Sequence, residues 1–186
     1  MNALMRPQAP VGHRFSGEDV LIMQEAGILL EGGPFELIEG EIIDAPSEGD
    51  AHQGLRTALM RFLNRSLPDD IYLASDGTLR LSDDNWPQPD FHLYPATPLP
   101  SAVSGGDTLL VIELSDSSLP YDMRRKAELY RHFGVREYWV IDLNAGLLHV
   151  LRADGAWPAP PIAFTETVEP GLLPGLSIRI ADFLPA

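Results

Sequence analysis

The sequence predicts an α/β fold with a mixed central β-sheet flanked by helices, and two observations support this. Residues 109–115 read Leu-Leu-Val-Ile-Glu-Leu-Ser, with apolar side chains on both alternating faces. Such a segment is typical of a central strand covered on both sides. Helical patterns over residues 50–66 and 119–133 each precede a predicted strand, which indicates two crossover connections of the parallel type.

The length of 186 residues and a hydrophobic content of 45% fit one globular domain. We expect this domain to span residues 15–186, and residues 1–14, with little periodicity, to form a flexible N-terminal arm. The domain begins with a predicted capping box, Ser16-Gly-Glu-Asp19, that opens a short helix through about Ala26.

Residues 35–43 predict a β-hairpin that turns at Glu39-Gly40. This turn pairs Glu36 with Ile43 and Ile38 with Glu41. Glu36 and Glu41 then lie on the same face as diagonal neighbours, and the pattern fits a solvated edge as well as a functional one.

The helix predicted over residues 50–66 begins where Ser47 together with Asp50 can cap it. His52 opens its apolar stripe, which continues through Leu55, Leu59, Phe62 and Leu63. A histidine in the first turn can contact a site at the helix N-terminus, although a simply packed histidine is the commoner case. Further strands are predicted over residues 71–75, 78–82, 90–94, 137–142 and 147–152, with a Pro- and Gly-rich loop over 95–107.

Two charged residues occupy positions where the pattern predicts burial. Glu113 lies in the central strand, where an unpaired carboxylate is costly unless it is paired or binds a metal. Lys126 lies in the middle of the apolar face of the helix over 119–133, with Asp122 at the edge of that face. We therefore expect Glu113 and Lys126 to be partners.

The net charge of −14 and the absence of a long basic run do not favour a polyanionic partner. The chain has no cysteine, which excludes disulfides and thiolate metal sites and fits a cytoplasmic location. No apolar run of transmembrane length and no signal-peptide pattern occur, so no membrane association is expected.

The sequence contains no Gly-rich phosphate loop, GxSxG or HExxH motif. What remains is an oxygen-rich set: Asp90, Glu113 and either Glu36 or Glu41, with Lys126 beside it. Carboxylates with ordered water suit Mg²⁺ or Mn²⁺, which can polarise a phosphodiester oxygen. A neighbouring lysine can orient water and offset developing negative charge.

Several motifs occur together and in order: Phe35-Glu-Leu-Ile-Glu-Gly-Glu41, His52-Gln53, Gln88-Pro-Asp90, Val111-Ile-Glu-Leu-Ser115, Asp122-x3-Lys126-x3-Tyr130, Gly134 to Asp142, and Leu173-Pro-Gly-Leu176. Over about residues 17–184 the chain resembles the Uma-type restriction endonuclease family of the PD-(D/E)xK nuclease superfamily. The resemblance implies a restriction-endonuclease-like core and metal-dependent DNA cleavage.

Carried over by position, the resemblance implies that Asp90 and Glu113 are the metal ligands. The superfamily lysine would stand at Ser115, and Lys126 of the following helix takes its place. Glu36 or Glu41 would be an additional acid, and His52 and Asp122 possible auxiliary residues.

The first functional hypothesis is therefore a Mg²⁺- or Mn²⁺-dependent DNA endonuclease. A homodimer whose cleft is lined by Arg124, Arg125 and Arg131 would reconcile it with the acidic composition. The alternatives are a non-catalytic nuclease-fold module for protein association or nucleic-acid scaffolding, with Glu113–Lys126 as a buried ion pair, and hydrolysis of another phosphate or ester.

Overall fold

The computed structural model describes residues 12–30, 33, 35–44, 48–155 and 159–184. Most of the expected N-terminal arm (1–14) and the candidate cap Ser47 lie outside the described residues. The arm and the single-domain assignment for residues 15–186 therefore stay predictions.

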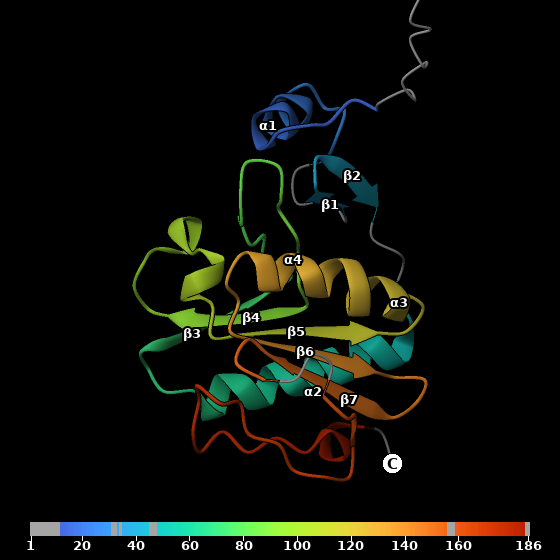
Figure 1. Cartoon of the computed structure of the whole chain (residues 1–186), viewed down its shortest axis with the longest axis vertical. Helices are drawn as coiled ribbons and strands as arrows, with labels where there is room; N and C mark the ends of the chain where they lie inside the picture. The colour runs from blue at the N-terminus through green and yellow to red at the C-terminus, as the bar shows by residue number, and fades with distance from the viewer. Residues whose placement is uncertain (1–11, 31–32, 34, 45–47, 156–158, 185–186) are drawn as a thin grey trace, which may run out of the picture.

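A six-stranded mixed sheet forms the centre of the molecule, in the order β3-β4-β5-β6-β7-β8 (Figure 1). Its strands are β3 (Ile71–Ser75), β4 (Phe91–Pro95), β5 (Leu110–Ser115), β6 (Glu137–Asp142), β7 (Leu147–Arg152) and β8 (Ile162–Ala163). Among these, β5 and β6 pair in parallel, and the other neighbours are antiparallel. The predicted α/β class with a mixed sheet flanked by helices is confirmed.

One face of this sheet is covered by α2 (Asp50–Ser66), which runs beneath β5 in Figure 1. Leu55, Leu59 and Leu63 of α2 are fully buried against the face of β5 that carries Leu110 and Ile112. The apolar stripe predicted for this helix is therefore its core-facing side. Burying three leucines of this kind stabilises the fold by roughly 1.5–3 kcal/mol each.

The opposite face of β5, which carries Val111, is covered by a helical segment with three parts (Figure 1). A short turn α3 (Leu119–Tyr121) leads into a π-helical turn over Asp122–Lys126, and α4 (Ala127–His132) follows. The sequence pattern predicts a continuous α-helix over 119–133. The structure differs from this prediction by the π-helical turn over Asp122–Lys126. π-turns of this kind occur frequently at functional sites.

The N-terminal helix and hairpin are confirmed as well. In α1 (Gly17–Glu25), the Ser16 hydroxyl accepts from the Asp19 N–H and the Asp19 carboxylate accepts from the Ser16 N–H, which completes the capping box. β1 (Phe35–Ile38) and β2 (Glu41–Asp44) pair in the predicted register, in a sheet of their own. Glu39 and Gly40 both have positive φ, as a type I′ turn requires.

Two expectations from the sequence are wrong: a second parallel-type connection, and a strand over residues 78–82. The helix over 50–66 follows β2, which belongs to the separate hairpin. Among the described strands, only the β5-to-β6 crossover through α3 and α4 is therefore a parallel-type connection. Residues 78–82 form no strand. They contact the returning chain through Leu79 N–H to Pro87 O and Leu81 N–H to Asn85 O, while β3 pairs with β4 instead.

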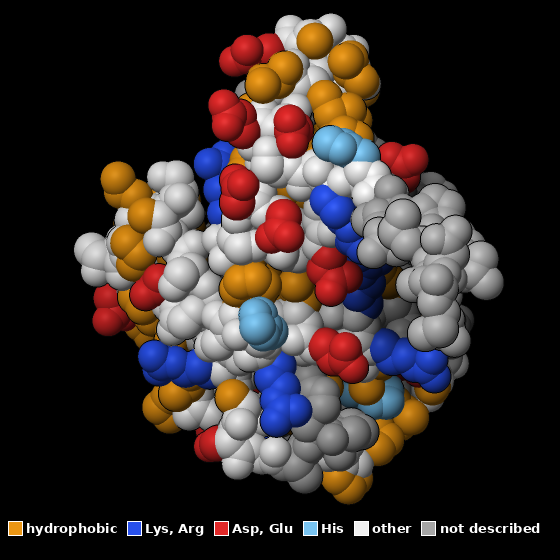
Figure 2. Space-filling model, turned by 45° about the horizontal axis from the view of Figure 1, so that its top comes forward, with side chains coloured by type: hydrophobic (Ala, Val, Ile, Leu, Met, Phe, Trp, Pro, Cys, Tyr) orange, Lys and Arg blue, Asp and Glu red, His pale blue; other side chains and the backbone are white. Residues whose placement is uncertain are grey.

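Short 3₁₀ turns at Pro100–Ala102, Gly105–Asp107 and Ile180–Phe183 complete the elements of the described residues. The projecting end of the molecule that carries α1 exposes the hydrophobic side chains of Leu21, Ile22, Ile28 and Leu30 (Figure 2). No helix within the described ranges is both long enough and apolar enough to cross a membrane.

Candidate active site

A cleft of about 510 Å³ opens where the β1–β2 hairpin, the start of α2, the end of β5 and the π-turn meet. The cleft is lined by the three residues predicted to form the core of the site, Asp90, Glu113 and Lys126, and by Glu36, one of the two candidates for the additional acid. They come from four separate segments, so the site exists only in the folded chain.

Asp90 lies directly before β4 and is buried. Its Oδ2 accepts a hydrogen bond of 2.8 Å from the backbone N–H of Leu114. Because Phe91 of β4 pairs with Ile112 of β5, continuing this antiparallel register by one residue sets Asp90 beside Glu113. The pairing of the two strands therefore brings the two carboxylates of the predicted metal site together.

Glu113 and Lys126 are partners, and both are buried. The Lys126 ammonium lies 3.0 Å from Glu113 Oε1, and the Tyr130 hydroxyl donates to the same oxygen at 3.1 Å. Because Lys126 closes the π-turn and Tyr130 follows it in α4, both donors reach the strand from one side. The segment thus fixes the orientation of the Glu113 carboxylate.

Burial by itself would lower the pKa of Lys126, but the carboxylates of Glu113 and Glu36 outweigh this effect and raise the pKa above its ordinary value. Lys126 is therefore a fixed positive charge at neutral pH. Burial also raises the pKa of the Tyr130 hydroxyl, with the Glu113 carboxylate adding to the effect, so Tyr130 remains a proton donor in the hydrogen bond to Glu113.

The structure separates Glu36 from Glu41. Glu36 is buried, its Oε1 lies 2.9 Å from Lys126 Nζ, and it accepts a 2.8 Å hydrogen bond from the Gln88 N–H. The Glu41 side chain is 47% exposed and pairs with Arg125 at 2.8 Å, outside the cleft lining. Among the two candidates for the auxiliary acid, the hairpin thus presents Glu36 to Lys126.

Asp122 opens the π-turn and faces the cleft. Its Oδ2 accepts hydrogen bonds from the hydroxyls of Ser115 at 2.5 Å and Ser118 at 2.6 Å, and its Oδ1 lies 3.9 Å from Lys126 Nζ. Ser115, which occupies the position where the superfamily lysine is expected, therefore helps to hold the turn that supplies Lys126.

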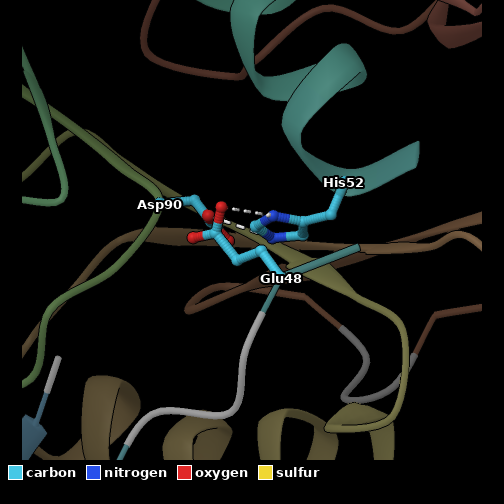
Figure 3. Close-up of side chains that lie close together, drawn as sticks. All are labelled: Glu48, His52 and Asp90. Carbon is cyan, nitrogen blue, oxygen red and sulfur yellow. Dashed lines mark ion pairs between the residues drawn. The ribbon is translucent and has the colours of Figure 1, made fainter. Parts of the chain in front are cut away.

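His52 lies in the first turn of α2 and contacts the site directly (Figure 3). Its Nε2 lies 3.1 Å from Asp90 Oδ1, and its Nδ1 lies 3.3 Å from Glu48 Oε2. Burial alone would lower the pKa of His52, but the hydrogen bond and charge of Asp90, together with Glu48, raise it.

Comparison with known proteins decides the family. The model of the Uma2 family, whose description is "Putative restriction endonuclease", matches residues 19–181. The chain belongs to the Uma2 family. No curated protein matches this chain.

A crystal structure of a putative nuclease belonging to DUF820 from Anabaena variabilis superposes on the Uma2 chain with a TM-score of 0.70. The two are 17% identical, and the match covers 91% of this chain and 97% of the other. At this identity the likeness shows the fold alone, and that fold is the nuclease-like one that the sequence predicts.

Nucleases generally use a divalent metal ion, and the donors in this Uma2 cleft fit one. Asp90 and Glu113 supply buried carboxylates, the kind of ligand that hard divalent cations prefer. In addition, one ligand atom from each of Glu48, His52 and Asp90 lies within 4.8 Å of the others.

Glu48 and Arg56 also belong to the site, and the sequence patterns do not predict them. Arg56 of α2 bridges Glu48 at 3.0 Å and Asp76 at 2.6 Å along the rim of the cleft. The one signal in the sequence is the spacing of four residues between Glu48 and His52. Because Glu48 precedes the helix rather than belonging to it, no periodic pattern marks the residue.

Proposed function

We propose that this Uma2 protein is a metal-dependent endonuclease that hydrolyses phosphodiester bonds in DNA. The observation that carries the proposal is the meeting of Asp90, Glu113 and Lys126 in one cleft, with Lys126 Nζ 3.0 Å from Glu113 Oε1. Asp90 and Glu113 would hold Mg²⁺ or Mn²⁺. Such an ion polarises a phosphoryl oxygen and lowers the pKa of bound water.

Lys126 supplies positive charge rather than a base in this proposal. Its raised pKa keeps the ammonium protonated, so it can stabilise the negative charge that develops on the phosphoryl group being attacked. Glu36 and Tyr130 act as positioning residues. The first holds the ammonium, and the second holds the Glu113 carboxylate that the ammonium contacts.

The charge of the cleft makes a cation necessary for binding of a phosphate. The described lining has eight carboxylates and two permanent cations, Lys126 and Arg56; the acidic residues are Glu36, Asp44, Glu48, Asp76, Asp90, Glu113, Asp116 and Asp122. On the face shown in Figure 2, Lys and Arg side chains are interspersed with acidic ones and form no continuous patch. A metal ion at Asp90 and Glu113 would replace the local repulsion between these carboxylates and a DNA phosphate by attraction. DNA binding should weaken steeply as the salt concentration rises.

The test is nicking of supercoiled plasmid at low salt with Mg²⁺ or Mn²⁺, comparing wild type with Asp90→Ala and Lys126→Ala. We expect metal-dependent nicking that both substitutions abolish. Asp69→Ala, a change of an exposed aspartate outside the cleft, serves as the matched control and should retain nicking. Nicking that persists in Asp90→Ala would contradict the proposal.

A second candidate is a nuclease fold that binds without cleaving. The ion pairs of Lys126 favour this candidate. The ammonium lies 3.0 Å from Glu113 Oε1 and 2.9 Å from Glu36 Oε1, so these two carboxylates already neutralise its charge. Retention of DNA in a mobility-shift assay without nicking by any divalent metal would support this candidate. The homodimer and the cytoplasmic location expected from the sequence stay predictions.

A further inference from the structure

His52 stands between two carboxylates at the edge of the cleft (Figure 3). Its side chain is 9% exposed, and the residue lines the cleft. Nδ1 accepts or donates no well-formed hydrogen bond in the described part of the chain, and its neighbour is Glu48 Oε2 at 3.3 Å, an ion pair when the imidazole is protonated. When the imidazole is neutral, a buried nitrogen of this kind can bind a metal ion beside the two carboxylates.

The donor atoms of Glu48, His52 and Asp90 lie almost as close together as the ligands of one metal ion. Octahedral ligands about 2.1 Å from a metal lie about 3.0 Å apart when they are adjacent. Opposite ligands lie about 4.2 Å apart, and one nitrogen of His52 and one oxygen from each of the two carboxylates all lie within 4.8 Å of one another. His52 of α2, Glu48 from the segment before α2 and Asp90 from the residue before β4 thus present their donor atoms to one small region.

The outer contacts of the three residues hold them in this arrangement. Arg56 binds Glu48 Oε1 at 3.0 Å, which leaves Oε2 turned toward His52. The Leu114 N–H binds Asp90 Oδ2 at 2.8 Å, while Oδ1 faces His52. Hydrogen bonds that orient ligating carboxylates in this way are a regular feature of metal sites.

We propose that Glu48, His52 and Asp90 bind a divalent first-row transition-metal ion through one imidazole nitrogen and one oxygen from each carboxylate. The inference rests on the proposed nuclease function for the use of the ion, since Asp90 is shared with the site assigned to Asp90 and Glu113. It adds an imidazole ligand and Glu48 to the metal-binding residues of the cleft.

The imidazole ligand determines which ions the site selects. Mg²⁺ prefers all-oxygen coordination and keeps several waters, whereas imidazole suits Zn²⁺, Fe²⁺ and other transition ions. Mn²⁺ accepts both kinds of ligand and is paramagnetic, so it serves as the probe. A large excess of Mg²⁺ should therefore not displace Mn²⁺ that is bound to this site.

The experiment measures Mn²⁺ binding to the full chain by electron paramagnetic resonance. The free-ion signal gives the affinity, and pulsed measurements detect a directly bound imidazole nitrogen. We expect nitrogen-coupled Mn²⁺ in wild type. His52→Gln should abolish the coupling and weaken binding about tenfold or more, the range for damaged metal sites. Glu48→Gln should weaken binding and keep the coupling, and His132→Gln, a change of an exposed histidine outside the cleft, should change neither.

Bound Mn²⁺ without nitrogen coupling, or equal affinity of wild type, His52→Gln and Glu48→Gln, would overturn the site. Glu48 is exposed and lies outside α2, so Glu48→Gln tests the ligand set even if His52→Gln disturbs folding. Plasmid nicking by the same proteins separates the two proposals. Nitrogen-coupled Mn²⁺ without nicking refutes the nuclease and keeps the site, whereas Mg²⁺-dependent nicking without nitrogen-coupled Mn²⁺ refutes the site and keeps the nuclease.

Discussion

Lys126 Nζ lies 3.0 Å from Glu113 Oε1, across the space between a central strand and the π-turn that covers it. The two residues are 13 positions apart, and both are buried. Each alone would be a costly buried charge, so each accounts for the presence of the other. The pair connects the sheet, the helical segment and, through Glu36, the hairpin.

Lys126→Met should lower the free energy of unfolding by about 3–5 kcal/mol, because it leaves the buried carboxylates of Glu113 and Glu36 without their cation. Urea unfolding of the metal-free protein at pH 7 measures the change. Arg125→Met, one residue earlier, removes partly exposed ion pairs and should cost no more than about 1 kcal/mol. Equal effects of the two substitutions would contradict the role assigned to Lys126.

Metal binding should stabilise the fold. At a free Mn²⁺ concentration of 100 times the dissociation constant, the gain is about 2.7 kcal/mol, or roughly 5–10 °C in melting temperature. Asp90→Asn should remove this gain, and a chelator should remove it from wild type. Asp69→Asn is the matched control and should retain the gain. A wild-type melting temperature that does not change with added metal would count against any metal site in this cleft.

Much of this site follows from local sequence rules. The alternation of Leu110, Val111 and Ile112 between two apolar clusters is the pattern that predicts a covered strand. The cost of burying charge is enough to predict that Glu113 and Lys126 are partners. The hairpin register is predictable from the two-residue turn at Glu39-Gly40, in which Gly40 adopts positive φ readily, whereas Glu39 is a weaker turn residue than asparagine or aspartate.

Other features depend on contacts that no local pattern encodes. Residues 78–82 look like a strand, but β4 takes the pairing position beside β3. The π-turn over 122–126 leaves no mark in hydrophobic periodicity. Glu36 differs from Glu41 only through the docking of the hairpin, because its Oε1 then meets Lys126.

Gly54 offers a test of the fold that leaves the cleft untouched. It lies exposed within α2, and a Cβ at this position would meet nothing within 4 Å. Gly54→Ala should therefore stabilise the protein by about 0.5–1 kcal/mol, since alanine loses less backbone entropy in a helix. Gly146→Ala is the contrast: its φ of +68° lies in the left-handed region, so this change should destabilise. Urea unfolding compares the two.

Glu36 and Glu41 form a natural pair for testing the auxiliary acid. The same hairpin carries both, yet Glu36 contacts Lys126 at 2.9 Å and Glu41 contacts Arg125 at 2.8 Å. Glu36→Gln should reduce metal-dependent plasmid nicking by about tenfold or more, because Lys126 loses a charged partner that positions it. Glu41→Gln should leave nicking within about twofold, since exposed ion pairs contribute little.

Two controls accompany the comparison of Glu36→Gln with Glu41→Gln. The unfolding midpoints show whether a loss of nicking is a loss of folded protein, and Glu36→Asp tests whether a shorter carboxylate restores part of the activity. Partial rescue by Glu36→Asp with a native midpoint would assign the effect to the charge at Lys126. Equal loss of nicking in Glu36→Gln and Glu41→Gln would instead mean that the hairpin acts as a whole, and that the contact between Glu36 and Lys126 has no separate role.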